Sequence, residues 1–184
     1  MKITLEIKVE DNEGGFARMV NWGHPGSDIT GMLARSEKVA GTCEELLGGE
    51  VYHYHSKLMM KDAETGGKYV WHQDYGIDHD FIAGQTGADV ERVNAIAKIC
   101  PLEFVELEPG DALFFHCNLL QTSNQNKSPY RRWAFLCAYN RASNNPIKKH
   151  HHPSYTKLHK VGNKINNSNN NKDDSKQQQQ QQQQ

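Results

Sequence analysis

Apolar and polar residues alternate at the start of the chain, where Ile3, Leu5, Ile7 and Val9 are separated by charged or hydroxyl side chains. Side chains two residues apart on a strand share a face, so this pattern predicts a half-buried strand. The same reasoning predicts six further strands. They cover residues 16–22, 51–60, 69–75, 104–107, 112–120 and 133–139, with Pro109-Gly110-Asp111 as a turn between the fourth and fifth of them.

Helical periodicity is confined to two short stretches. Ser36 is a suitable N-cap for a helix that ends at Gly48-Gly49, and Asp89 is a suitable N-cap for a second helix. The apolar faces of these helices comprise Val39, Ala40, Cys43, Leu46 and Leu47 in the first, and Val90, Val93, Ile96 and Ala97 in the second. Many strands with two helices before and between them predict a mostly β fold, a sandwich or open barrel of the jelly-roll kind.

The 184 residues are enough for one domain, which we place at residues 1–160. From Asn163 onward the sequence is rich in Asn, Lys and Asp, contains Ile165 as its one apolar residue, and ends in eight glutamines. Such a segment cannot bury enough apolar surface to offset its chain entropy. Residues 161–184 are therefore expected to form a disordered Asn/Gln-rich tail.

Charge and cysteine content narrow the function classes. The net charge of −1 gives no electrostatic footprint for nucleic acid or a membrane, and the short basic cluster at residues 148–152 is interpreted as a solvated loop. The four cysteines lie far apart without a CxxC pair, which excludes a zinc ribbon and suits a reducing compartment. No signal peptide, membrane span or peroxisomal signal is evident. We therefore expect a cytoplasmic protein whose partner is a small-molecule substrate.

His72 and Asp74 flank Gln73 in a predicted strand, so their side chains are expected on one face. An imidazole and a carboxylate on one face can bind one metal ion together. One more ligand from another strand would complete the two-histidine, one-carboxylate triad of non-haem iron oxygenases, which leaves positions open for a cosubstrate and dioxygen. Further along, Arg132 begins an apolar strand, and its planar fork suits a carboxylate of 2-oxoglutarate. We interpret the neighbouring Arg131 as a surface residue.

Four separate segments resemble the phytanoyl-CoA dioxygenase family. They are WHQDYG at 71–76, GGEVYHYHSKLMMK at 48–61, ELEPGDALFFHCNLLQTSNQN at 106–126 and RRWAFLCAYN at 131–140. The resemblance implies a double-stranded β-helix that hydroxylates a small organic substrate with Fe(II), 2-oxoglutarate and O2.

The same resemblance implies roles for individual residues. His72 and Asp74 match the first two iron ligands of the family, and Arg132 and Ser123 match residues that hold 2-oxoglutarate. Lys57 lies where a further contact to this cosubstrate is expected.

The chain departs from the family at the distal metal ligand. The family's segment resembles LLHxSxxN, whereas this chain reads LLQTSNQN at 119–126, so Gln121 takes the place of the histidine. An amide oxygen is a neutral and poorer donor to Fe(II) than an imidazole. His116 lies five residues earlier, an odd spacing that would point it to the opposite face of one strand. We interpret His116 as a packed or hydrogen-bonded residue.

The chain also looks short. After Tyr75-Gly76 the family continues through further core strands before a segment resembling GGQTGAD, which here follows almost at once as AGQTGAD at 83–89. Missing strands would leave an edge unpaired and core residues uncovered.

Three hypotheses follow from these features. The first is a dioxygenase of this family whose activity is impaired by Gln121. The second is a non-catalytic binding protein that keeps the same fold. The third is a cupin-like protein that binds zinc through His53, His55 and His72, although His53 and His55 are more simply interpreted as a half-exposed strand face.

Overall fold

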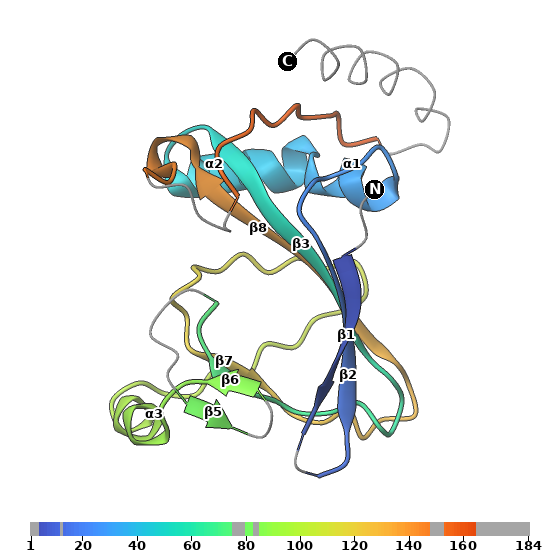
Figure 1. The fold of residues 1–184 in the computed structure, drawn as a ribbon, viewed down its shortest axis with the longest axis vertical. Helices are drawn as coiled ribbons and strands as arrows, with labels where there is room; N and C mark the ends of the chain where they lie inside the picture. The colour runs from blue at the N-terminus through green and yellow to red at the C-terminus, as the bar shows by residue number, and fades with distance from the viewer. Residues whose placement is uncertain (1–3, 12, 75–79, 83–84, 148–152, 165–184) are drawn as a thin grey trace. The chain divides into compact units, whose positions relative to one another are not determined.

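The computed structural model describes residues 4–11, 13–74, 80–82, 85–147 and 153–164, and this part of the chain is mostly β with a few short helices (Figure 1). The elements in chain order are β1 (Thr4–Glu10), β2 (Phe16–Trp22), α1 (Ile29–Ala34), the π-helical turn η1 (Glu37–Gly41), α2 (Thr42–Leu47), β3 (Val51–Lys61), β4 (Tyr69–His72), β5 (Asp80–Ile82), β6 (Gln85–Gly87), α3 (Val90–Ala97), β7 (Gln121–Ser123), β8 (Arg132–Arg141) and the 3-10 turn η2 (Ala142–Asn144). The largest sheet has the order β1-β2-β3-β8, while β4 pairs with β7 and β5 pairs with β6. The mostly β prediction is therefore confirmed.

Most strands predicted from alternation are present. The first alternating stretch forms β1, residues 16–22 form β2, residues 51–60 lie in β3 and residues 133–139 lie in β8. The strand predicted at 69–75 is β4, which ends at His72, and Tyr75 lies outside the described residues.

The helix caps were predicted more accurately than the helices. Ser36 accepts a hydrogen bond from the Val39 amide at 3.3 Å, but the continuous helix expected after it is divided into η1 and α2. Gly48 ends α2 at φ 72°, a left-handed conformation that glycine adopts without strain. Asp89 caps α3, as predicted, by accepting from the Arg92 amide at 2.8 Å. Sequence reasoning missed α1, which the carboxylate of Asp28 caps. None of the helices in the described ranges is long and apolar enough to span a bilayer.

The strands predicted at 104–107 and 112–120 are not formed. Residues 101–120 contain turns but no strand, although the Pro109-Gly110-Asp111 turn is present and the Asp111 amide donates to the Glu108 carbonyl at 3.0 Å. Apolar side chains along this segment are exposed, including Phe104 at 78% and Leu107 at 53%. A strand requires neighbours for its backbone hydrogen bonds, and no described strand pairs with this segment. The prediction was wrong because apolar alternation reports which face could be buried and not whether a partner strand exists.

The chain divides into two compact units. The first comprises Met1–Glu6, Val20–Leu58 and Phe135–Gln184, and the second comprises Ile7–Met19 and Met59–Ala134. Strands β1, β2, β3 and β8 each contribute residues to both units.

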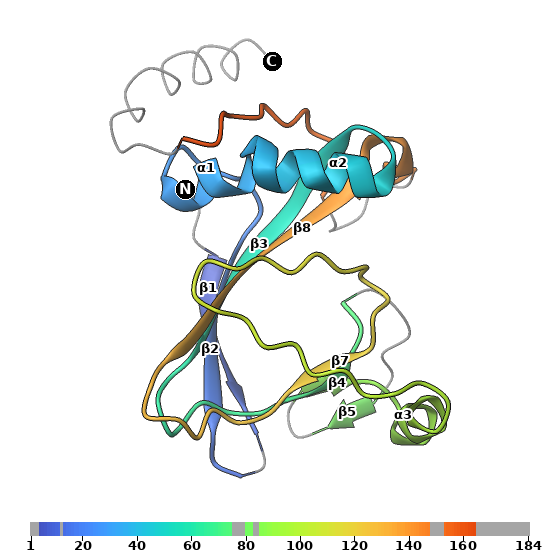
Figure 2. The same ribbon diagram turned by 180° about the vertical axis from the view of Figure 1, so that it is seen from behind.

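In the first unit, α1 and α2 lie over the ends of β3 and β8, as both ribbon views show (Figures 1 and 2). The hydroxyl of Tyr139 on β8 donates to the carbonyl of Ala34 on α1 at 2.5 Å. The segment after residue 153 also contacts this layer, because the Val161 amide donates to the Arg35 carbonyl at 2.9 Å. The tail that we expect to be disordered lies, from residue 165, outside the described residues, as does the basic cluster at 148–152.

A polar cluster centred on His53 lies inside the first unit. The side chain of His53 is 7% exposed, and its ring nitrogens lie 2.7 Å from Ser56 Oγ and 3.3 Å from the Gly23 carbonyl oxygen. Ser56 is fully buried, and its Oγ lies 3.6 Å from Cys137 Sγ. Burial lowers the pKa of His53 to about 4, so the ring is neutral at physiological pH. The half-exposed face expected here is therefore wrong for His53, which is a core residue with both nitrogens engaged.

Acidification should destabilise the protein through His53. The pKa is 6.5 for the model imidazole and about 4 in the fold, so the unfolded chain binds more protons between these values. Stability should therefore fall as the pH is lowered from 6.5 to 4, by on the order of 3 kcal/mol from this residue, and should not depend on His53 above that range. Urea unfolding at pH 7.0 and 4.5 measures the effect.

The matched variants are His53→Gln, which removes the titrating ring, and His116→Gln, which removes an exposed one. His53→Gln should lose most of the pH dependence, whereas His116→Gln should keep it. Equal pH dependence in the natural chain and in His53→Gln would contradict this assignment.

Candidate functional site

The candidate site lies in the second unit, where β4 and β7 pair in antiparallel fashion. The register places His72 opposite Gln121 and Tyr69 opposite Ser123, with an irregularity between the two pairs. The hydroxyl of Thr122 donates across the pair to the Tyr69 carbonyl at 2.7 Å. This register brings the position of the expected distal ligand next to the segment that carries His72 and Asp74.

His72 and Asp74 point their side chains toward one another, as two prospective ligands of one metal ion would. Nδ1 of His72 lies 2.8 Å from the Val70 carbonyl oxygen, so this nitrogen carries the proton and Nε2 keeps a free lone pair. Nε2 lies 3.9 Å from Oδ1 of Asp74. Two ligand atoms that lie roughly 2 Å from one ion and at a right angle to each other are about 3 Å apart, so the two side chains must move closer together to bind one ion as neighbouring ligands. The side chains of His72 and Asp74 are 16% and 28% exposed, so an ion can reach them.

Gln121 does not complete this metal site. Its amide nitrogen donates to Oδ2 of Asp74 at 2.9 Å, so the amide presents a donor where a metal site requires a lone pair. Across the described ranges, no group of three or more His, Cys, Asp and Glu residues could hold a metal ion. The donor set therefore fits iron at two positions and fails at the third, and any ion would compete with Gln121 for Asp74.

Other histidines do not supply the missing ligand. His116 is exposed and accepts a hydrogen bond from the Asn118 amide at 3.2 Å, so it is hydrogen-bonded and not packed. The strand on which the spacing argument for His116 depended is not formed. The zinc hypothesis is not supported either. Both ring nitrogens of His53 have protein partners, and no cluster of three metal-binding residues occurs among the described residues.

A cationic group lies at the Ser123 end of β7, and its central residue was missed from the sequence. Lys61, at the end of β3, is 2% exposed and donates to Ser123 Oγ at 2.8 Å, to the Ser123 carbonyl at 3.2 Å and to the Asn124 carbonyl at 2.7 Å. Burial lowers the pKa of Lys61 to about 8; the charge of Arg132 lowers it further and that of Asp11 opposes the change. Lys61 therefore contacts Ser123 directly and interacts electrostatically with Arg132.

The two adjacent arginines differ in their surroundings. Arg131 stacks on an aromatic side chain, with its guanidinium carbon 4.6 Å from the ring centroid of Trp133. Arg132 is the first residue of β8 and is exposed. Its guanidinium is therefore accessible to an anion in solution.

Lys57, which was expected to contact the cosubstrate, belongs to the first unit. The lysine that contacts Ser123 is Lys61, four residues further along β3. The sequence offers one signal for Lys61. Lys57 and Lys61 are four residues apart on β3, so their side chains share a strand face.

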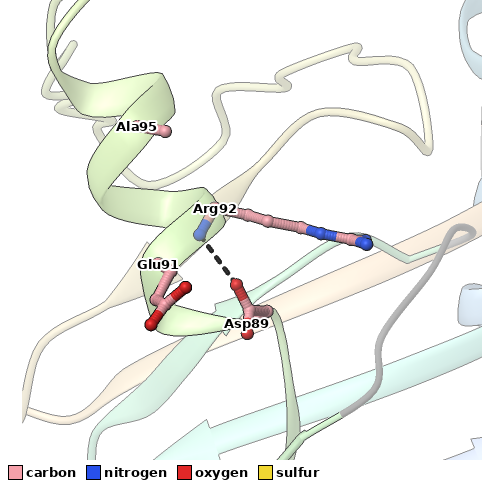
Figure 3. A pocket seen from close by; sticks show the side chains of 4 residues that line it. All are labelled: Asp89, Glu91, Arg92 and Ala95. Atoms are coloured by element: carbon pink, nitrogen blue, oxygen red, sulfur yellow. Dashed lines mark hydrogen bonds between the residues drawn. The ribbon is translucent and has the colours of Figure 1, made fainter.

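A surface hollow beside α3 is separate from these residues. It is lined by Asp89, Glu91, Arg92 and Ala95, and Figure 3 shows the Asp89 carboxylate bonded to the Arg92 backbone nitrogen. This carboxylate caps the helix, and none of the candidate site residues lines the hollow.

Comparison with known proteins identifies dioxygenases and a hydroxylase as relatives, although no family profile matches the chain. The chain is 25% identical to L-proline trans-4-hydroxylase of Streptomyces griseoviridis over 197 residues, covering 77% of this chain and 73% of the relative. It is 24% identical to ectoine dioxygenase of Bordetella parapertussis over 200 residues, covering 79% of this chain and 65% of the relative. The expected resemblance to iron- and 2-oxoglutarate-dependent oxygenases is confirmed at this level, but none of these relatives is phytanoyl-CoA dioxygenase itself.

Solved structures confirm the jelly-roll fold. The crystal structure of EctD from S. alaskensis with bound Fe superposes with a TM-score of 0.66 at 22% identity, covering 80% of this chain and 68% of EctD. The structure of the same protein with 2-oxoglutarate and 5-hydroxyectoine gives the same TM-score and coverage.

The alignments also show an internal deficit. The match to the proline hydroxylase spans 197 positions, whereas 77% of 184 residues is about 142, so about 55 aligned positions have no residue in this chain. The loss of strands expected after Gly76 stays a prediction. The junction itself, at residues 75–79 and 83–84, lies outside the described residues.

Replacing Gln121 by histidine should tighten metal binding. The imidazole would remove the amide donor from Asp74 and add a third lone pair opposite His72. Loss of a supporting residue around a metal typically costs about 10–100-fold in affinity, so gaining a direct ligand should improve Co(II) affinity by at least about tenfold. Calorimetric titration of Co(II) into the natural chain and Gln121→His measures this.

Asn124→His is the matched control, because it adds an imidazole at an exposed position just after the same strand. A comparable gain in Asn124→His would show that any added histidine binds the ion. That result would contradict the assignment of Gln121 to the ligand position.

Proposed function

We propose that the chain is a dioxygenase dependent on Fe(II) and 2-oxoglutarate, that it hydroxylates a small organic molecule, and that Gln121 slows its turnover. The observation that carries this proposal is the register of β4 and β7, which unites His72 and Asp74 with the distal ligand position. The similarity to a proline hydroxylase and to ectoine dioxygenases supports the class of reaction.

The surroundings of each candidate residue support a particular role in binding iron or 2-oxoglutarate. His72 would bind iron through Nε2, because its Nδ1 proton is held by the Val70 carbonyl, and Asp74 would bind iron through its carboxylate. Iron, when bound, supplies the oxygen chemistry. Ser123 and Arg132 would hold the distal carboxylate of 2-oxoglutarate, with the arginine fork making two parallel hydrogen bonds.

The substrate proposal is limited to size and class. The relatives are named for proline and ectoine, so we propose a small organic molecule of similar size. The relatives offer no support for a large acyl-CoA substrate.

A non-catalytic binding protein is the second candidate, and one contact favours it. The hydrogen bond from Gln121 to Asp74 stabilises the carboxylate without any metal, as expected for a site that no longer needs an ion. Both candidates retain the binding of 2-oxoglutarate. They differ in whether the protein with Fe(II) forms succinate from 2-oxoglutarate faster than the same solution without protein.

Binding of 2-oxoglutarate should depend on Arg132 and not on Arg131. Arg132→Ala removes a bidentate charge-assisted contact and should weaken binding by at least about tenfold, since hydrogen bonds to charged groups contribute ~1.5–3 kcal/mol. Arg131→Ala should change affinity less than about twofold, because that guanidinium stacks on Trp133. Calorimetry with 2-oxoglutarate tests both variants, and equal losses would show that neither arginine recognises the ligand specifically.

A further inference from the structure

The segment between α3 and β7 exposes a row of large apolar side chains. Every residue from Lys98 to Leu119 is exposed, and both ribbon views draw residues 101–120 without a strand (Figures 1 and 2). The exposed apolar side chains include Leu102, Phe104, Val105, Leu107, Phe114 and Phe115. Single exposed apolar side chains are ordinary on a protein surface, but a contiguous patch of them marks an interaction site.

The charges of this segment all have one sign. Residues 99–126 contain neither Lys nor Arg, and their acidic side chains are Glu103, Glu106, Glu108 and Asp111. Residues 127–141 have the opposite composition, because they contain no acidic residue and their basic side chains are Lys127, Arg131, Arg132 and Arg141. A surface built from the first stretch therefore complements a surface built from the second.

The start of β8 offers the complementary surface. Among the described strands β8 has β3 as its single neighbour, so its outer edge presents backbone groups that another strand can pair with. Two aromatic side chains beside this edge are exposed, Tyr130 at 77% and Trp133 at 45%. The first residues of β8, up to Ala134, belong to the same compact unit as the apolar segment. Within the described part of one chain, the two do not pair as strands.

We propose that the occupant of this edge is a second copy of the chain, whose residues 102–108 add to the start of β8 as an extra strand. An extended segment that joins a sheet edge gains backbone hydrogen bonds, and its side chains provide specificity. Each copy carries both surfaces, so a two-fold axis repeats the contact and closes the assembly as a dimer. The net charge of −1 gives the copies little mutual repulsion.

The dimer pairs Glu106 of each copy with Arg131 of the other. The guanidinium of Arg131 stacks on Trp133, and a stacked guanidinium keeps its N–H edge available to a carboxylate. The contact requires neither iron nor 2-oxoglutarate, so it goes beyond the proposed function and is tested without either.

The test is sedimentation equilibrium of the full-length chain, with a reductant present because the thiols of Cys100 and Cys117 are exposed. The natural chain should give about twice the monomer mass of 20.9 kDa. Glu106→Arg and Arg131→Glu each set like charges against one another at both contacts, and each should raise the dissociation constant of the dimer by at least about tenfold. Glu91→Arg is the control, because it makes the same charge change at an exposed position on α3, and it should leave the constant within about twofold.

An equimolar mixture of Glu106→Arg and Arg131→Glu separates loss of pairing from loss of folding. In the mixed dimer the introduced arginine of one variant faces the introduced glutamate of the other, and the second contact keeps its natural pair. The mixture should therefore dimerise at least about tenfold more tightly than either variant alone. A mixture no tighter than the separate variants would overturn the proposal.

Three further results would also overturn it. The first is a natural chain that stays monomeric at every concentration reached, and the second is a dimer that both variants retain. The third comes from hydrogen exchange, in which the amides of residues 102–107 should be protected in the dimer and lose that protection on dilution. Protection that does not depend on concentration would show that the chain itself covers this segment.

Discussion

Strands β4 and β7 run antiparallel, and the candidate site depends on their register. That register sets Gln121 opposite His72 and Ser123 opposite Tyr69. Backbone hydrogen bonds and the hydrogen bond from the Thr122 hydroxyl to the Tyr69 carbonyl hold the pair. A slip of one residue would turn every side chain of β7 to the other face and separate Gln121 from Asp74. The same short strand carries Gln121 at one end and Ser123 at the other.

Structural features that depend on residues close together in the chain could be predicted from the sequence. The caps Ser36 and Asp89 and the alternating strands near both ends of the chain follow from side chains a few residues apart. The juxtaposition of Gln121 with His72 could be expected only through the family resemblance, because no local pattern fixes the pairing of distant strands. The buried position of Lys61 and its contacts could not be found at all, since they depend on three acceptors about sixty residues away.

Among the described residues, the stretch between α3 and β7 contains no strand. Its sequence alternates as a strand would, yet Phe104, Leu107 and Leu113 remain exposed. The alignment with the proline hydroxylase lacks about 55 positions in this chain, which is enough for several strands of ordinary length.

The central claim is that the site retains its cosubstrate contacts and two metal ligands while Gln121 limits turnover. Succinate formation from 2-oxoglutarate, measured with saturating Fe(II) and ascorbate in the natural chain and in Gln121→His, tests this most directly. We predict that the natural chain forms succinate at a rate near background. Gln121→His should form succinate at least about tenfold faster, because it gains a third metal ligand. Equally fast succinate formation by both proteins would contradict the claim, because it would mean that a residue other than the one at position 121 completes the metal site.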